Sequence, residues 1–258
     1  MSQATGSFRS IWNSLLPQSA YSGKFRSLVL FVAAITVLTL HAWAGSAFAA
    51  IGFVQGSFAC PATPQLTVPV TFSSTQTAGN LNVVVVGWND TTAAVSSVTD
   101  SLGNVYTLAV GPTKNFGSAG LTITQSIYYA KNIAGAVAGA NTVTVRFTVA
   151  AAYADIRILE YSGLDRVTPI DVTAAAIGTN AATNSGAATT TNANDLIFGA
   201  NTVAVTTTAP GAGFTKRMIT VPDADIAEDQ VVTTAGSYSA TAPLNTPGNW
   251  VMQMVAFK

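Results

Sequence analysis

Apolar and hydroxyl side chains alternate along much of this chain, and this pattern constrains the fold more than any other feature. In segment 66–72 the even positions are apolar, while the odd positions hold threonine and proline. Segment 141–149 is the most regular, with valine and phenylalanine at one set of alternate positions and threonine and arginine at the other. Because successive side chains of a strand point to opposite faces, this alternation predicts strands with one buried face.

Short strands of this kind recur with turn residues between them. Pro69 cannot donate a ladder hydrogen bond, so its strand is expected at a sheet edge. The four valines at 83–86 indicate a strand buried on both faces, and glycine and asparagine at 100–104 predict a hairpin turn between 95–99 and 105–110. Further strands are expected at 121–129, 153–161, 170–176, 196–205, 226–233 and 250–257. The predicted fold is all-β, a two-sheet antiparallel sandwich of jelly-roll type that follows an N-terminal signal helix.

The first 49 residues have the pattern of a signal peptide. Arg9, Lys24 and Arg26 are the only charges before residue 90, an apolar run follows at about 28–40, and Ala47-Phe48-Ala49 matches an A-x-A cleavage site. The alternative is an uncleaved anchor helix, which would be the protein's sole link to a membrane. We therefore expect a secreted or cell-surface protein whose residues 50–258 form a single β-sandwich domain, with no internal repeat.

The residues left after cleavage exclude several chemistries. The one histidine, His41, lies in the leader, and Cys60 is the one cysteine. Catalysis by Ser-His-Asp or Cys-His groups therefore lacks its base, and no zinc or iron site of cysteines and histidines can be assembled. The eleven acidic residues remain while three of eleven basic residues are lost, so no basic patch for nucleic acid is expected.

Several local motifs resemble modules of secreted and surface-exposed bacterial proteins. The motifs are Gly87-Trp88-Asn89-Asp90, the stretch 100–106, Asn141-Thr142-Val143-Thr144-Val145, Glu160-Tyr161-Ser162-Gly163, and Trp250 with the closing Ala256-Phe257-Lys258. Such modules look like jelly-roll β-sandwiches and often stand beside immunoglobulin-like domains. Their activity is unassigned, so the resemblance implies a fold and a location and supplies no catalytic residues.

The densest acidic group is Asp223, Asp225, Glu228 and Asp229. Asp223, Asp225 and Glu228 imitate the acidic strand of jelly-roll glucanases, in which two carboxylates flank the glycosidic bond; Asp225 and Glu228 would then be the catalytic pair. All four could instead bind calcium, which prefers several carboxylate oxygens. The third interpretation is a solvated acidic loop that pairs with Lys216 and Arg217.

Aromatic side chains are the usual means by which a β-sandwich binds sugars, since a flat ring stacks on the apolar face of a pyranose. Trp88 stands beside Asn89 and Asp90 at an expected strand end, so these three residues are the predicted ligand-binding group. In the doublet Tyr128-Tyr129 the two rings must point to opposite faces, and at least one is expected to leave the core. The remaining aromatic candidates are Tyr106, Tyr153, Tyr161, Tyr238 and Trp250.

Two other segments allow two interpretations each. Glu160 follows Ile156 and Ile158 on an apolar face, so it is either a buried functional acid or is turned to solvent by a bulge, which is the interpretation we favour. Segment 178–194, nearly all small and polar, is either a mobile loop over a site or a polar edge strand with a flexible turn.

The sequence therefore predicts a non-catalytic β-sandwich that binds or adheres outside the cell, with an extracellular glycan or another surface component as its partner. A glycan hydrolase and a purely structural surface component are the alternatives.

Overall fold

Strands make up the regular structure of residues 50–117 and 122–258, the part of the chain that the computed structural model describes. Within these ranges no helix is long and apolar enough to cross a membrane. The predicted signal peptide, residues 1–49, lies outside them. Ala49–Lys258 group together as one compact unit.

The first sheet has five antiparallel strands, in the spatial order β1-β8-β3-β6-β5. These strands are β1 (Gly52–Ala59), β8 (Asp155–Ser162), β3 (Leu81–Trp88), β6 (Ile123–Ala130) and β5 (Thr107–Asn115). One face of this sheet packs against a three-stranded sheet, β2 (Gln65–Thr71), β7 (Thr142–Ala151) and β4 (Val95–Asp100), in the order β2-β7-β4. The predicted all-β antiparallel sandwich is confirmed, and β2 with its Pro69 is an edge strand as expected.

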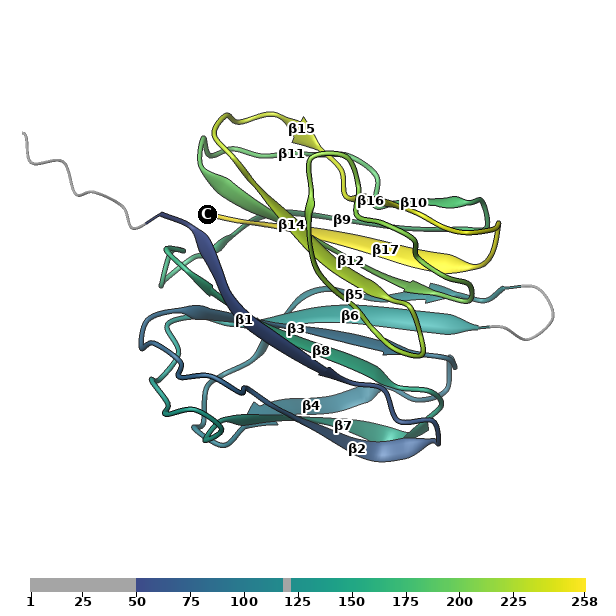
Figure 1. Cartoon of the computed structure of the whole chain (residues 1–258), viewed down its shortest axis with the longest axis horizontal. Coiled ribbons are helices and arrows are strands. Elements are labelled where there is room, and N and C mark those ends of the chain that lie inside the picture. Colours follow the sequence, from purple (N-terminus) through teal and green to yellow (C-terminus); the bar gives the residue numbers. More distant parts are fainter. Residues whose placement is uncertain (1–49, 118–121) are drawn as a thin grey trace, which may run out of the picture. The chain divides into compact units, whose positions relative to one another are not determined.

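The other face of the first sheet packs against a second five-stranded sheet, in the order β13-β14-β12-β17-β9. Its strands are β13 (Thr215–Ile219), β14 (Ile226–Val232), β12 (Asp195–Val203), β17 (Trp250–Phe257) and β9 (Ile170–Gly178). The far face of this sheet is covered by two short pairs, β10 (Ala182–Asn184) with β16 (Thr241–Pro243), and β11 (Ala188–Thr189) with β15 (Ser237–Tyr238). Figure 1 shows the resulting stack of β-layers.

The layered arrangement explains why the central strands carry few polar residues. Every residue of β3 is buried: Val84 and Val86 point into the core shared with β2 and β7, while Val83 and Val85 point into the core shared with the second five-stranded sheet. A fully buried valine contributes about 1.5–3 kcal/mol relative to an exposed one, so a strand buried on both faces is strongly stabilised. The prediction from the four successive valines is confirmed.

The two five-stranded sheets have the same topology, which the sequence did not lead us to expect. The first half of the chain comprises strands β1 to β8 and the second half strands β9 to β17. In the first sheet the first strand of its half, β1, lies beside the last, β8, and β3, β6 and β5 follow in that order. In the second sheet the first strand of its half, β9, lies beside the last, β17, and β12, β14 and β13 follow. Each half thus repeats one strand order without a visible sequence repeat. This repeat is one of strand order alone, and the sequence, which shows no internal repeat, does not reveal it.

The predicted hairpin around residues 100–104 does not form. β4 pairs with β7 and β5 pairs with β6, so this connection crosses from one sheet to another. The turn itself is present, since Gly103 has a φ of 73°. Asp100 stabilises it by accepting hydrogen bonds from the backbone N–H groups of Leu102 and Asn104. The prediction of a turn is confirmed, but the strands on either side of it, β4 and β5, pair with other strands and not with each other.

Candidate functional site

Several polar loops meet at one end of the first five-stranded sheet, which we call the Cys60 end. β1 and β3 end there and β8 begins there, because Ala59 pairs with Ile156 and Gly87 pairs with Asp155. The loop between β13 and β14 joins them: the hydroxyl of Thr220 donates a 2.6 Å hydrogen bond to Asp155. This end therefore collects side chains from both halves of the chain.

A buried charge cluster lies beneath these loops. Arg157, which has no exposed surface, forms a 2.9 Å ion pair with Asp155 through Nε and lies 3.9 Å from Asp225. Its Nη1 donates to the backbone carbonyls of Asn201 and Ile226. Burial raises the pKa of Asp225 well above its ordinary value, Asp155 adds to the rise, and Arg157 offsets part of it. The cluster joins the two five-stranded sheets and is closed to solvent.

Cys60, Asp155 and Asp223 form the one group of three potential metal ligands among the described residues, with their ligand atoms within 4.8 Å of one another. A thiolate and two carboxylates could hold a divalent metal. However, burial and then the neighbouring Asp155 raise the pKa of the Cys60 thiol strongly, so the thiol keeps its proton and donates it to Asp155 over 3.2 Å. Burial and Asp155 also raise the pKa of Asp223.

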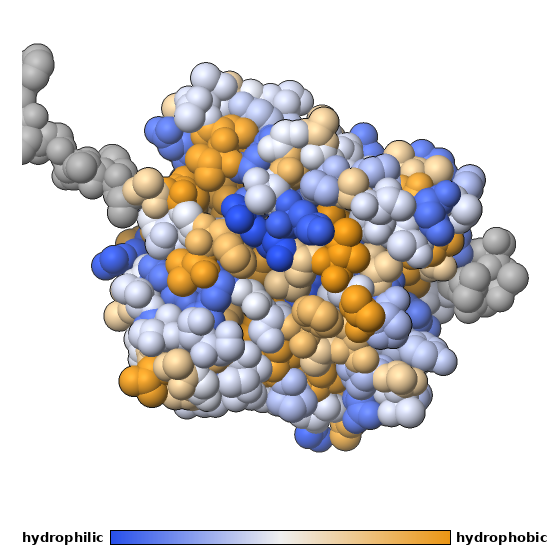
Figure 2. Space-filling model, viewed as in Figure 1, coloured by the Kyte–Doolittle hydropathy of each residue, from blue (hydrophilic) through white to orange (hydrophobic). Residues whose placement is uncertain are grey.

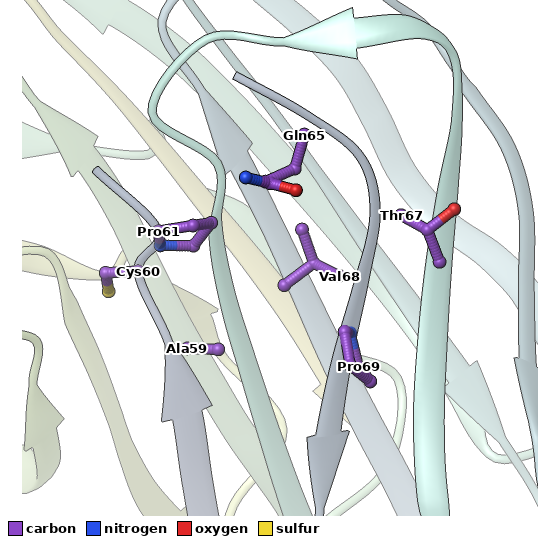
Figure 3. A pocket seen from close by; sticks show the side chains of 7 residues that line it. All are labelled: Ala59, Cys60, Pro61, Gln65, Thr67, Val68 and Pro69. Atoms are coloured by element: carbon purple, nitrogen blue, oxygen red, sulfur yellow. The ribbon is translucent and has the colours of Figure 1, made fainter. Parts of the chain in front are cut away.

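A hollow of about 310 Å³ lies beside this group, between the end of β1 and strand β2. Figure 3 shows its walls, formed by Ala59, Cys60, Pro61, Gln65, Thr67, Val68 and Pro69. The lining combines apolar and small polar groups, with one thiol and one side-chain amide. It is a shallow surface feature rather than an enclosed substrate pocket.

The four acidic residues expected to form one site have different partners. Asp225 belongs to the buried cluster, and Asp229 pairs with Arg217 through two hydrogen bonds of 2.6 and 2.8 Å while accepting a third from Tyr161. Glu228 is fully buried and accepts a 2.8 Å hydrogen bond from the backbone of Gly211. With Asp223 beside Cys60, these carboxylates do not converge on one point. The expected pairing with Arg217 is present, and it involves Asp229.

The predicted group Trp88, Asn89 and Asp90 is divided by the structure. Trp88 is 1% exposed and packs edge-to-face on Phe147, so the expectation of an exposed ring is wrong. Strand β3 continues to this residue and turns its side chain into the core. Asn89, in contrast, is exposed, and its backbone N–H donates to the carbonyl of Ala152.

Asp90 holds this loop in a fixed shape. Its carboxylate accepts hydrogen bonds from the backbone N–H groups of Thr92, Ala93 and Ala152, at 2.9, 2.7 and 3.0 Å. Burial acts to raise the pKa of Asp90, but these hydrogen bonds outweigh it and the pKa lies below its ordinary value. Asp90 is therefore a structural anion, and it ties the loop after β3 to the turn before β8.

Phe58, near the end of β1, and Phe116, just after β5, are exposed near this end, and so is Tyr153, in the turn tied to Asp90. The Tyr153 side chain is 52% exposed and its φ is 45°, a left-handed backbone conformation that is uncommon for a bulky residue. Tyr153 was one of several aromatic candidates, and it was expected to begin a strand. β8 begins two residues later at Asp155, and the residues before it include no glycine, proline, asparagine or aspartate that would have signalled this turn.

Two further expectations about buried residues are corrected. Tyr128 and Tyr129 do point to opposite faces, yet each packs against a core, because the sheet is covered on both sides. Glu160 is not turned to solvent: it is fully buried and accepts hydrogen bonds from Gln55, Asn80 and the backbone of Thr77. Three donors from distant segments make this carboxylate part of the fold.

Comparison of the chain with protein-family models, with curated proteins and with solved structures finds no match in any of the three.

Proposed function

We propose that this protein is an exported, non-catalytic β-sandwich module that binds a glycan, or another component of a cell surface, through the loops at the Cys60 end. The observation that carries the proposal is the exposed ring of Tyr153 on a strained turn beside Asn89.

The backbone of Tyr153 supports a role outside folding. A left-handed conformation costs a non-glycine residue roughly 1–2 kcal/mol, and the half-exposed ring regains little of this by packing. Strain of this kind persists where the surroundings impose it, and it clusters at ligand-binding positions. Two hydrogen bonds hold this turn: the backbone N–H of Ala152 donates to Asp90, and the backbone N–H of Asn89 donates to the carbonyl of Ala152.

The chemistry of this loop surface suits a neutral polar ligand. A tyrosine ring offers an apolar face and a hydroxyl, while the exposed Asn89 and Thr92 offer an amide and a second hydroxyl. On the face shown in Figure 2, strongly hydrophilic residues form small separate groups among apolar and weakly polar ones. A sugar, with hydroxyls and apolar ring faces, matches this chemistry better than a polyanion such as nucleic acid.

The hydrolase alternative receives less support. Glycoside hydrolysis needs two carboxyl groups that both reach the glycosidic bond. Asp225 is 1% exposed and Glu228 is fully buried, and each is engaged by protein groups. A polysaccharide could not contact this pair without opening the core.

Binding is tested with a glycan array and with insoluble polysaccharides, using the wild-type chain and the variant Tyr153→Gly. Glycine adopts the left-handed conformation freely, so this variant keeps its fold and its melting temperature stays equal or rises by a few degrees. Loss of the ring should weaken binding about tenfold, since an aromatic contact contributes about 0.5–1.5 kcal/mol beyond its buried area.

Val105→Ala is the matched control, because Val105 is also an exposed apolar residue but follows β4 at the opposite end of the sheet. It should bind as the wild type does. No glycan signal from the wild type would instead support a structural surface component. Equal binding by wild type and Tyr153→Gly would show that the binding surface does not lie at the Cys60 end.

A further inference from the structure

A second pair of carboxylates lies at the end of the second five-stranded sheet where β9 and β12 begin, on either side of the last residues of β17. Asp171 is near the start of β9 and Asp195 is the first residue of β12. Their carboxyl groups are close enough to share a hydrogen bond when one of them carries a proton. The loop 191–194 leads into Asp195 and folds against Asp171, since the backbone N–H and the hydroxyl of Thr191 both donate to Asp171.

Asp195 differs from every other buried carboxylate in the described residues. It has no exposed surface, and neither of its oxygens accepts a hydrogen bond. Glu160 has amide donors, Asp229 has Arg217 and Tyr161, and Asp155 has Arg157. A buried carboxylate without donors is costly unless a cation or a proton neutralises it.

The electrostatics of the pair agree with this geometry. Burial raises the pKa of Asp195 to about 7, the carboxylate of Asp171 adds to the rise, and Lys258 offsets part of it. For Asp171 burial acts in the same direction, but the hydrogen bonds from Thr191 outweigh it, and its pKa lies below the ordinary value. Asp171 is therefore the charged member of the pair, and Asp195 faces that charge.

We propose that Asp171 and Asp195 bind one calcium ion, with further oxygens from the loop 191–194. Calcium takes six to eight oxygen ligands in flexible geometry, and carboxylates are its preferred side-chain donors. Thr191, Asn192 and Asn194 place neutral oxygens in the same loop. Magnesium fits less well because it requires a stricter octahedral shell and retains its water. This site is separate from the Cys60 end, so it does not depend on glycan binding.

The test is the melting temperature of the purified chain at neutral pH, with EDTA and with increasing calcium chloride. At a calcium concentration roughly ten times the dissociation constant, the melting temperature should rise by about 3–5 °C. Asp195→Asn and Asp171→Asn should each abolish the rise. Asp195→Asn should also be at least as stable as the wild type in EDTA, because it removes an uncompensated buried charge.

Asp223→Asn is the control for calcium binding elsewhere, since Asp223 lies in the acidic group near Cys60. It should retain the full calcium-dependent rise. Titration calorimetry of the wild type and both pair variants provides a direct second measurement. The proposal is wrong if calcium leaves the wild-type melting temperature and heats unchanged, which would mean that the pair shares a proton alone. It is equally wrong if the rise survives in Asp195→Asn.

Discussion

At the scale of single residues, this protein is defined by buried and partly buried carboxylates that are held by specific donors. Glu160 receives three donors, and Asp90 accepts hydrogen bonds from three backbone N–H groups. Glu228 is less completely hydrogen-bonded: one carboxylate oxygen accepts a hydrogen bond from the backbone of Gly211, while the other oxygen accepts no hydrogen bond. Burial accordingly raises the pKa of Glu228 to about 7.

Glu228→Gln should stabilise the protein, and more so at higher pH. The folded-state pKa of Glu228 is raised, so the folded state keeps the proton that the unfolded state releases, and stability falls as pH rises from about 4.5 to about 7. The glutamine side chain does not ionise, so the variant does not lose stability over this pH range. Its advantage in free energy of unfolding should grow across this window to roughly 3 kcal/mol at most, as measured by urea unfolding at several pH values. An advantage that does not change with pH would contradict the assignment.

At the scale of elements, the central strands are shaped by close approach of their neighbours. β17 is buried along its whole length between β12 and β9. Trp250 of β17 is paired with Gly178 of β9, and its indole lies directly over that glycine. The indole Nε1 donates to Asn180 just beyond the end of β9. A glycine at the last position of β9 thus makes room for the ring that closes this end of the core between the second five-stranded sheet and the short strand pairs that cover it.

Gly178→Ala should therefore destabilise the protein, because the new Cβ would overlap the six-membered ring of Trp250. Overpacking of a filled core costs about 1–3 kcal/mol, and displacement of the ring would shift its fluorescence emission. Denaturant unfolding followed by tryptophan fluorescence measures both effects. Gly52→Ala is the control, since a Cβ at that strand glycine meets only ordinary contacts. Equal stability of the two variants would show that the ring can move aside freely.

At the scale of the whole molecule, two topologically alike halves share one interior. The core between the five-stranded sheets contains Leu159 and Tyr161 from the first half and Phe198 and Phe257 from the second. Arg157 crosses the same interface to the carbonyls of Asn201 and Ile226. Neither five-stranded sheet could expose this face to water without a large loss of buried apolar area.

The two halves should unfold in one transition. Trp88 lies in the core of the first half and Trp250 in that of the second, so variants that retain one of these tryptophans report on each half separately. Their denaturant midpoints should coincide. Arg157→Met should lower both midpoints together and reduce the free energy of unfolding by about 3–5 kcal/mol, because it leaves Asp155 and Asp225 buried without their cation. Separated midpoints in the parent chain would contradict a shared interior.

The sequence was sufficient for the features that depend on local geometry. Alternation at 141–149 predicted β7 and its buried Val143 and Val145, although Val149 near its end is exposed. Pro69 predicted an edge strand because proline lacks the donor that a central strand needs. Four consecutive valines predicted a strand covered on both faces. The sequence also predicted that the acidic group pairs with Arg217, although it did not indicate that Asp229 is the residue that forms the ion pair.

Only the tertiary structure decided what covers each face. Trp88 is buried, and Tyr128 and Tyr129 are partly buried, because sheets from distant parts of the chain pack on both sides of β3 and β6, and no local pattern records that packing. For the same reason the partners of Glu160 and the isolation of Asp195 are invisible in sequence, since their neighbours come from segments dozens of residues away. Strand periodicity is a property of a few adjacent residues, whereas burial, pKa and the repeated topology arise from contacts that form only when the sheets stack.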